Sequence, residues 1–438
     1  MALLCTQLAA STAALVQVTT LGKQLFDITG RDLDLGLLGL AEFLPAMLLV
    51  AVTGSAADRF DRRRLVTLGL SGEALAAAGL AWYAATDGRE TWPIYTLVVS
   101  FGLARAFTTP ALRSLPPDIA PAGGLPRLIA FGAGTWQTAA IVGPVLAGFL
   151  YVVSPAAPLV ACVAITGTGA VLIRFARPRR AHVVGPPSLT GPEAAALVDL
   201  GDEARPAETV DAVGEAFAGV ADDPAPPAGR RGRLHEAFEG LRVIRRNPVL
   251  LGAISLDLFA VLFGGAVALL PALAENRLGV GAVGLGWLRA ATGIGAAVVT
   301  LWLSARPITR HVGRTLYLVV ALFGVFTVVL GVTRSFAVAF VTLLLLSAAD
   351  SVSVFIRSTL VPLVTPSPAR GRVMAVEGVF LGASNELGAF ESGVAGQVLG
   401  TSGAVVAGGV ATLGVVGAWT VLFPALGRMD RFPDRPPD

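Results

Sequence analysis

The chain has 438 residues, of which 54% are hydrophobic and 14% are charged, and its formal net charge is +3. Because soluble globular domains carry about 25% charged residues, this composition excludes a largely water-soluble protein and indicates an integral membrane protein. The arginines lie at the ends of apolar stretches instead of on one face, so the small positive charge does not predict nucleic-acid binding.

Apolar stretches recur along nearly the whole sequence, and twelve of them reach the roughly 20 residues that one bilayer crossing needs. The first lacks a preceding basic region and is longer than the apolar core of a secretory signal, so we expect a membrane helix there. The predicted fold class is therefore an all-α membrane protein with twelve transmembrane helices. The spans are residues 3–28, 35–57, 65–86, 94–115, 128–152, 158–176, 248–271, 281–304, 315–333, 336–358, 373–398 and 403–426.

Arginine is concentrated in the loops on one side of the predicted spans. That side holds residues 59–64 and 306–314, the segment between the sixth and seventh spans, and the C-terminus; the opposite loops offer Arg31, Arg89, Arg277 and Arg334. Loops rich in Lys and Arg stay in the cytoplasm. Both termini and the long central loop are therefore predicted to be cytoplasmic.

The fourth and fifth spans recur as the tenth and eleventh at a constant offset of 245 residues, as Gly143 with Gly388 and Gly148 with Gly393 show. Such a duplication predicts two pseudo-symmetric six-helix bundles with a binding site between them, near the middle of the membrane. We expect an N-terminal bundle at 1–176, a cytoplasmic linker at 177–247, a C-terminal bundle at 248–427 and a tail at 428–438. The other matching pairs are Pro117 with Pro362, Pro121 with Pro366, Arg127 with Arg372, and Ala130 with Ala375.

The linker has two parts. Residues 185–229 are rich in Pro, Ala and acids and nearly free of aromatics, which predicts disorder. Leu234, Phe238, Leu241 and Ile244 then recur at helical spacing beside arginines. This spacing predicts an amphipathic helix on the cytoplasmic membrane surface, either a plain support or a lipid-sensing element.

A short charged segment, GSAADRFDRRR at 54–64, lies between two long apolar stretches. Charge there orients the chain and can also form a latch between the halves. We expect Asp58 to reach Arg372 at the cytoplasmic start of the eleventh helix, where the helix N-terminus also favours a carboxylate. The latch would be closed in the outward-facing state, with Asp58 and Arg62 as its working residues. Its other members are Gly54, Arg59 and Arg63.

This charged segment resembles the loop-2/3 signature of the major facilitator superfamily of transporters. GPVLAG at 143–148, LPPD at 115–118 and GRVMA at 371–375 strengthen the resemblance. Within the superfamily the chain is similar to drug and siderophore exporters, including enterobactin exporters and macrolide efflux proteins. The resemblance implies the major facilitator fold and multidrug or siderophore efflux by an antiporter in a bacterial cytoplasmic (inner) membrane. It also implies an antiport-type helix bend at Gly143, Pro144 and Gly148, for which ordinary helix packing is the alternative.

Two positions depart from the superfamily pattern. Asp61 stands where the signature often has Gly, which implies a tighter or less mobile turn. The equivalent loop of the second half, residues 306–314, keeps its arginines but has no acid. The resemblance therefore implies an asymmetric latch.

Ionisable residues inside the spans cost at least about 2.5 to 3.5 kcal/mol on insertion scales, so each needs a partner or a function. With a rise of about 1.5 Å per residue, Asp257 and Arg289 come within one helical turn in height. A salt bridge between their helices is feasible. Asp257 would then be either a proton-coupling acid or one member of a permanent buried ion pair.

Arg105 lies near the midplane of the fourth helix, and its repeat partner at the same offset is Asp350. These opposite charges can face each other across the cavity, where Arg105 would attract an anionic substrate. Bonding of Arg105 to backbone carbonyls or to a neighbouring Glu is the alternative. Glu386, in the eleventh helix, has either a coupling or a packing role.

Lys23 is the only lysine, with Asp27 one turn later and Glu42 at a similar predicted depth. The three could form an outer gate or a proton-entry site. The preferred interpretation is that Lys23 reaches to the outer interface and Asp27 is solvated there. Glu73 and Glu377 lie near inner helix ends, where we expect pairing with cytoplasmic arginines.

No catalytic group, metal site or phosphate-binding loop is recognisable, so neither an enzyme nor a cofactor is expected. A proton gradient would then supply the energy. We predict a monomer that exports a small amphipathic small-molecule substrate across the lipid bilayer by alternating access, with no nucleic-acid partner. The alternatives are a lipid or lysolipid flippase, a sensor or scaffold that moves no solute, and a passive facilitator.

Overall fold

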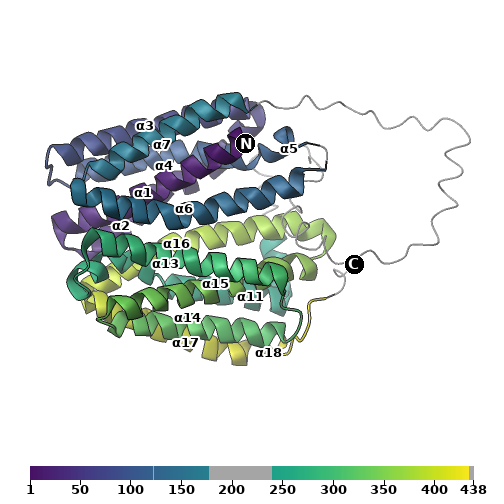
Figure 1. Cartoon of the computed structure of the whole chain (residues 1–438). Coiled ribbons are helices and arrows are strands. Elements are labelled where there is room, and N and C mark those ends of the chain that lie inside the picture. The colour runs from purple at the N-terminus through teal and green to yellow at the C-terminus, as the bar shows by residue number, and fades with distance from the viewer. Residues whose placement is uncertain (122, 177–238, 434–438) are drawn as a thin grey trace, which may run out of the picture.

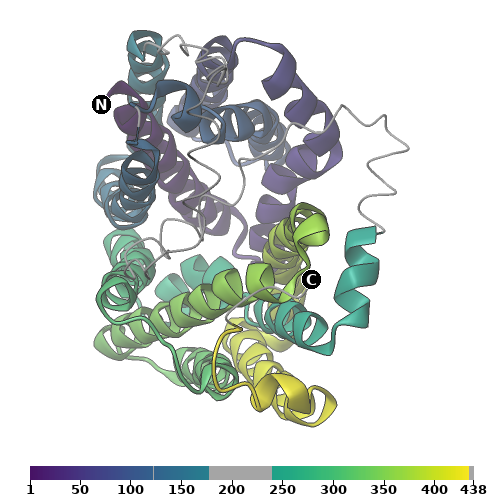
Figure 2. The same ribbon diagram turned by 90° about the vertical axis from the view of Figure 1, so that its right-hand side faces the viewer.

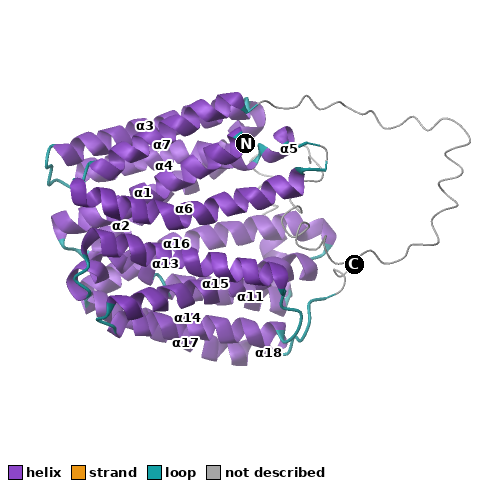
Figure 3. Ribbon diagram, in the orientation of Figure 1, coloured by secondary structure: helices purple, strands orange, loops and turns teal. Residues whose placement is uncertain are grey.

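The computed structural model describes residues 1–121, 123–176 and 239–433. Within these ranges it describes only the backbone of residues 50–51, 54–55, 57–59 and 368. All regular structure in this described part is helical (Figures 1 and 3). The helices of the first half are α1 (Ala2–Thr29), α2 (Asp32–Arg59), α3 (Arg62–Ala85), α4 (Trp92–Arg113), α5 (Pro116–Ile119), α6 (Leu125–Val153), α7 (Ala157–Leu172) and η1 (Ile173–Phe175).

The second half forms a separate group of helices. Figure 2 looks along the bundle, with the first half (purple to blue) in the upper part and the second half (green to yellow) in the lower part. The second-half helices are α11 (Pro248–Phe263), η2 (Ala266–Leu269), α12 (Leu270–Ala272), η3 (Leu273–Arg277), α13 (Gly281–Ala305), α14 (Val312–Val332), α15 (Phe336–Val364), η4 (Ser367–Ala369), α16 (Arg370–Leu399), α17 (Thr401–Leu422) and α18 (Pro424–Gly427).

Nine helical segments of the described part are long and apolar enough to cross a membrane. Three further helices, α2, α4 and α16, have 28, 22 and 30 residues and are long enough as well. Polar side chains such as Arg105 in α4 and Glu386 in α16 lower the hydropathy of the last two. The predicted all-α fold of twelve membrane helices in two bundles is confirmed.

Polar side chains ahead of the apolar runs determine where helices begin. The Asp61 carboxylate accepts hydrogen bonds from the backbone N–H groups of Arg63 and Arg64, at 2.9 and 3.2 Å, and caps α3. Asn247 caps α11 in the same way, followed by Pro248 in the first turn. Asp61 therefore has a structural use that explains an acid at this position of the charged segment.

The seventh span is broken, although a continuous helix was predicted over 248–271. α11 ends at Phe263, and after Gly264 and Gly265 the chain continues in short 3₁₀, α and π segments to Arg277. A Cβ at Gly265 would lie 2.5 Å from the carbonyl oxygen of Gly388 in α16. Irregular backbone at membrane depth is tolerated where it faces protein or a cavity, and both glycines line a cavity described below.

The glycines related by the 245-residue offset occupy equivalent places in the two halves. Gly143 of α6 packs on α1, and Gly388 of α16 packs on α11. Gly148 meets α13 of the other half, where a Cβ would lie 2.6 Å from a carbonyl oxygen. Gly393 meets α2, where a Cβ would lie 2.9 Å from the Cα atom of Gly36. The halves are thus joined by two pseudo-symmetric crossings, and a glycine at each lets the backbones approach closely.

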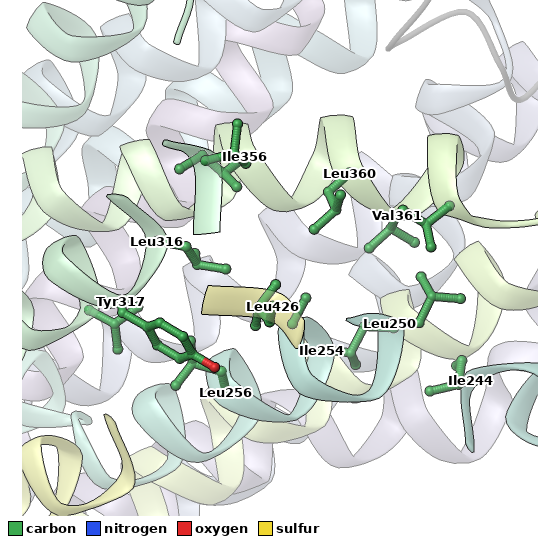
Figure 4. Packing of buried hydrophobic residues seen from close by; sticks show 14 of the residues in the cluster. Ile244, Leu250, Ile254, Leu256, Leu316, Tyr317, Ile356, Leu360, Val361 and Leu426 are labelled. Atoms are coloured by element: carbon green, nitrogen blue, oxygen red, sulfur yellow. The ribbon is translucent and has the colours of Figure 1, made fainter. Parts of the chain in front are cut away.

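The second half has an apolar core that also binds the end of the linker and the C-terminal segment (Figure 4). Residues 239–246 are helical, and Ile244 is buried beside Leu250. Leu426 of α18 is buried in the same cluster. The described part of the predicted amphipathic helix therefore buries its apolar side in protein. Leu234, Phe238 and the acidic stretch at 185–229 lie outside the described residues.

Candidate functional site

A central cavity lies between the halves, in two adjoining compartments of about 500 and 470 Å³ that share Glu42 and Glu386. We name the end of the bundle at the α1–α2 turn the outer end and the opposite end the inner end. The first compartment is lined by α2, α4 and α16 and extends to Thr53 and Arg113 on the inner side. The second is lined by α1 and α2 and by helices of the second half. Small-molecule sites typically have about 300–1,000 Å³ and a few polar groups on apolar walls, which this cavity matches.

Glu42 of α2 lies between arginines from both halves. Arg105 of α4 and Arg289 of α13 are near enough to act electrostatically on its carboxylate. Arg289 also approaches Gly22 of α1, where a Cβ would lie 3.6 Å from Nη2. Its Nε atom is buried and has no hydrogen-bond partner among the described residues. Arg289 therefore keeps donor capacity beside the second compartment.

Asp257 does not pair with Arg289, so this prediction is wrong. Its carboxylate lies 2.9 Å from Nη2 of Arg357 in α15, whose Nη1 lies 3.8 Å from the carboxylate of Glu377 in α16. Asp257 and Arg357 are 5% and 4% exposed. The heights of Asp257 and Arg289 in the membrane are compatible, but their helices are not packed on each other. α11 packs on α15, α16 and α17, whereas α13 packs on α6 and α15.

Arg357 was missed in the sequence. It lies near the inner end of the tenth predicted span, where an arginine is expected as an orientation signal. The spacing could have revealed the role of Arg357. Asp350, Ser353 and Arg357 follow one another at i, i+3 and i+7 and so share one polar face of a helix.

Arg105 and Asp350 both line the central cavity, but in different compartments, and they form no ion pair with each other. Arg105 lines the first compartment, and Asp350 lines the second, where Asp257 and Arg357 act on its charge. Behind Arg105 lies Glu73 of α3, which is 1% exposed. Glu73 is therefore not paired with cytoplasmic arginines as expected. Arg105 thus lines the cavity as expected and lies near acids of two neighbouring helices, Glu42 of α2 and Glu73 of α3.

At the outer end Lys23 is buried, with 7% of its surface exposed, so its predicted position at the outer interface is wrong, whereas Asp27 is exposed as expected. It forms ion pairs with Asp27 of its own helix and, at 3.1 Å, with Glu275 of η3 in the second half. Tyr151 of α6 donates a hydrogen bond of 2.8 Å to Asp27. Glu42 is not part of this group. The Lys23 group thus links the two halves at the outer end.

A second polar contact joins the halves at the same end. The Thr401 hydroxyl at the start of α17 donates a hydrogen bond of 2.7 Å to the Asp32 carboxylate at the start of α2. The glycine crossings at Gly148 and Gly393 lie in the outer part of their helices as well. The outer end is therefore closed in this structure, whereas the lining of the central cavity extends toward the inner end.

The ion pair between Lys23 and Glu275 predicts a change in amine reactivity when it is broken. Glu275→Gln removes a partly exposed pair worth up to about 1 kcal/mol, so we expect Lys23 to react with a soluble amine reagent about fivefold faster. Because Lys23 is the only lysine, mass spectrometry of its peptide reads the rate directly. Glu90→Gln, in the exposed α3–α4 loop, is the control. Equal rates for Glu275→Gln and the unmodified chain would contradict this arrangement.

Two arginines of the charged segment, Arg62 and Arg63, bond to neighbouring elements of the first half. Arg62 donates hydrogen bonds to the Asp118 carboxylate at 2.8 Å and to the Ser114 carbonyl at 3.0 Å. Arg63 donates to the Ala176 carbonyl at 2.9 Å. These contacts fix the inner ends of α3, α4 and α7 relative to one another.

The predicted partner of the latch also has a contact of its own. Arg372 at the start of α16 forms an ion pair with Glu239 in the helical residues 239–246. Of Gly54, Asp58 and Arg59 only the backbone is described, as part of α2. A contact between Asp58 and Arg372 therefore stays a prediction.

Pro144 does not interrupt its helix, since α6 continues from Leu125 to Val153. Its carbonyl oxygen faces α13, where a Cβ at Gly286 would lie 2.5 Å away. Together with Gly148, this residue therefore contributes to the close crossing between the halves. Among the described residues, no group of His, Cys, Asp and Glu side chains could hold a metal ion.

The described residues form twelve long helices in two related bundles around a central cavity, which is the architecture of a multi-pass membrane transporter. A family model described as Major Facilitator Superfamily matches residues 2–389 of the chain. The chain belongs to the major facilitator superfamily. It is 27% identical over 125 residues to an uncharacterized MFS-type transporter, YfiS, of Bacillus subtilis (strain 168), and this match covers 28% of this chain and 29% of that protein's length.

Solved structures with low sequence identity share the fold. A peptide transporter, POT, matches with a TM-score of 0.69 and 14% identity over 98% of this chain and 95% of that one. A POT family transporter in complex with 5-aminolevulinic acid matches with a TM-score of 0.68 and 11% identity over 97% and 96%. A bacterial homologue of the iron transporter ferroportin, in an inward-facing state, matches with a TM-score of 0.63 and 14% identity over 98% of both chains.

Proposed function

We propose that the protein is a proton-coupled exporter of a small amphipathic compound that works by alternating access. The central cavity carries this proposal. It combines apolar walls with the acids Glu42, Asp350 and Glu386 and with Arg105 and Arg289, contributed by both halves. An amphipathic molecule can place its apolar part on such walls and its polar groups on these side chains.

The contacts between the halves support an inward-facing state. Lys23–Glu275 and Thr401–Asp32 close the outer end, and the first compartment extends toward the inner end. With both termini in the cytoplasm, as the arginine distribution predicts, the cavity opens to the cytoplasm. The homologue of ferroportin with which the chain shares its fold is described in an inward-facing state too.

Alternating access then requires the outer contacts to break and inner contacts to form. In the outward-facing state, we propose that Asp58 meets Arg372 and that Arg62 supports this latch. A proton gradient favours export when the cavity acids bind protons on the outer side and release them on the inner side, because protonation and substrate compete for the same carboxylates. Glu42 and Glu386, shared by both compartments, are the acids on which this competition is proposed to act.

The test is a transport assay in proteoliposomes with an imposed pH gradient and a panel of siderophores, macrolides and lysolipids, with the protein reconstituted as a monomer. We expect one amphipathic compound to accumulate against its gradient and to dissipate the pH gradient. Glu386→Gln is expected to lower this rate about tenfold, as the loss of a charged hydrogen-bond partner worth about 1.5 kcal/mol does. Glu391→Gln is the matched control, an acid of α16 that lines neither compartment.

Each other outcome contradicts proton-coupled export. Movement of lysolipids without dependence on the pH gradient would indicate a flippase. Downhill movement of a panel compound that no pH gradient accelerates would indicate a passive facilitator. If neither the panel nor a metabolite extract yields any transported compound, a sensor or scaffold becomes the better interpretation.

A further inference from the structure

Four charged side chains meet inside the second half, beside the central cavity and separate from Glu42 and Arg105. This second-half charge cluster consists of Asp257 (α11), Asp350 and Arg357 (α15) and Glu377 (α16). Arg357 lies 2.9 Å from the Asp257 carboxylate and 3.8 Å from that of Glu377. Asp350 lies two turns before Arg357 and interacts electrostatically with both Asp257 and Arg357. One guanidinium therefore lies beside two carboxylates, and a third carboxylate lies two turns away on its own helix.

This charge balance favours an additional proton. An uncompensated charge in a buried site is costly, and a carboxyl group avoids the cost by binding a proton. Three carboxylates around one arginine leave two negative charges without a cation inside the cluster. A bound proton removes one of them without any change in packing.

The other helices around the cluster add little compensating charge. Arg289 of α13 lines the second compartment with Asp350, but there it acts on Glu42. In α14 the ionisable groups are Arg314, which is exposed, and Tyr317, which donates hydrogen bonds to carbonyls near the end of α17. α17 has no ionisable residue. Glu386 of α16 lines the same compartment and adds a further negative charge.

A small cavity connects Asp350 to Asp257. It has a volume of about 10 Å³, close to the space that one water molecule needs. Asp257, Asp350 and Ser353 line it, and the Ser353 hydroxyl oxygen is buried without a hydrogen-bond partner among the described residues. A hydroxyl both donates and accepts, so it can pass a proton between two carboxylates. Because Asp350 also lines the central cavity, the path begins where the substrate would bind.

We propose that this cluster is a second proton-binding site of the transporter, in addition to Glu42 and Glu386, with one proton shared between Asp350 and Asp257 through Ser353. A hydronium ion in the water of the central cavity gives a proton to the Asp350 carboxylate and leaves a neutral water molecule. Asp350 then passes a proton to the Ser353 hydroxyl, which gives its own to Asp257 and stays neutral. A water molecule in the small cavity bridges these groups, because the hydroxyl makes no direct hydrogen bond to either carboxylate. The coupling role rests on the proposed function, whereas the proton binding itself does not.

Protonation of Asp257 changes the contacts of Arg357 with the two neighbouring helices, α11 and α16. Neutral Asp257 attracts Arg357 less than the carboxylate does, and Glu377 is already 3.8 Å from the other Nη atom. Arg357 then moves from α11 toward α16. α16 is the helix that crosses α2 of the first half at Gly393. The proton thus acts on one of the two crossings that join the halves.

The first measurement needs no substrate. Purified protein in lipid nanodiscs receives an acid pulse, and a pH-indicator dye counts the protons taken up, while infrared difference spectra report protonated carboxyl groups. We expect Asp350→Asn and Asp257→Asn each to lose about one proton, and the double variant to lose no more than either, because the two sites titrate as a pair. Glu391→Gln, the control outside the cluster, should not change the carboxyl signal that these two variants share.

Two results would overturn the proposal. One is a proton count that neither variant lowers, and the other is a double variant whose loss is the sum of the single losses, since independent acids titrate separately. Ser353→Ala keeps every charge and is expected to slow the uptake that reaches Asp257 while Asp350 still binds its proton. An unchanged rate would remove Ser353 from the path.

The second measurement separates this inference from the proposed function. With a compound found in the panel, Asp257→Asn should abolish accumulation driven by the pH gradient and leave downhill counterflow at the rate of the unmodified protein, because Asp257 lines neither compartment of the central cavity. Loss of both would show that Asp257 is needed for the transport step itself and would contradict a coupling role. If the panel yields no substrate, proton-coupled export fails, and the shared proton is still decided by the first measurement.

Discussion

Replacing Arg357 by Gln is expected to lower the free energy of unfolding by about 3–5 kcal/mol, because it leaves buried carboxylates without their cation. The arginine is 4% exposed and contacts acids on two other helices, α11 and α16. Loss of the guanidinium therefore weakens the packing of three helices together. Thermal unfolding in detergent micelles measures the effect, with Arg89→Gln in the exposed α3–α4 loop as the control.

A second variant separates lost charge from lost packing. Asp257→Asn combined with Arg357→Gln removes both charges and keeps similar volumes, so we expect it to unfold at a higher temperature than Arg357→Gln alone. If Arg357→Gln unfolds at the same temperature as the unmodified protein, Arg357 does not compensate buried carboxylates. If the double variant is no more stable than the single one, the ion pair is not the reason for the loss.

Gly393→Leu is expected to reduce transport to background by preventing closure of the outer end. A Cβ there would lie 2.9 Å from the Cα atom of Gly36 in α2, and a larger side chain has no room. Overpacking costs about 1–3 kcal/mol in general. The cost falls on the closed outer end alone, so the outward-open population should rise. Gly148→Leu at the pseudo-symmetric crossing should act in the same way.

Distances between spin labels on the outer loops measure this population. Labels at Arg89→Cys and Arg334→Cys, with Cys5 and Cys162 replaced by Ala, are expected to lie farther apart in Gly393→Leu than in its parent. Gly414→Leu is the control, because a Cβ at Gly414 of α17 meets no atom within 4 Å. An unchanged distance distribution would show that the crossing at Gly393 does not hold the outer end closed.

The fold could be predicted because it depends on patterns that the sequence carries directly. Lengths of apolar stretches set the number of crossings. The 245-residue offset predicted two related bundles, and Gly148 and Gly393 indeed lie at equivalent places, where α6 crosses α13 and α16 crosses α2. The break in the seventh span could not be predicted, since glycine is frequent in unbroken membrane helices as well. The helix breaks at Gly264 and Gly265, where Phe323 of α14 approaches Gly264 and α16 approaches Gly265.

The pairing of charges could be predicted less well. The sequence gives the height of a residue along its helix, but not the direction in which its side chain points or the helix that lies there. Heights along the helices brought Asp257 and Arg289 together, but the neighbours of α11 and its rotation decide the contact, and these are set by packing. Arg357 was hidden by its position at a helix end, where arginine usually marks orientation. Lys23 was misplaced for a similar reason. Its burial between the two halves depends on the position of Glu275 in η3, which the sequence does not show.

The polarity of α4 and α16 has a consequence for how the protein is made. A helix enters the membrane by its own hydropathy, and Arg or Asp at its centre costs about 2.5–3.5 kcal/mol on insertion scales. α4 carries Arg105 and α16 carries Glu386, and neither helix reaches the hydropathy of the nine apolar ones. We expect both to be retained in the bilayer only together with neighbouring helices already present. The side chains that line the cavity thus make the membrane insertion of these two helices depend on the rest of the bundle.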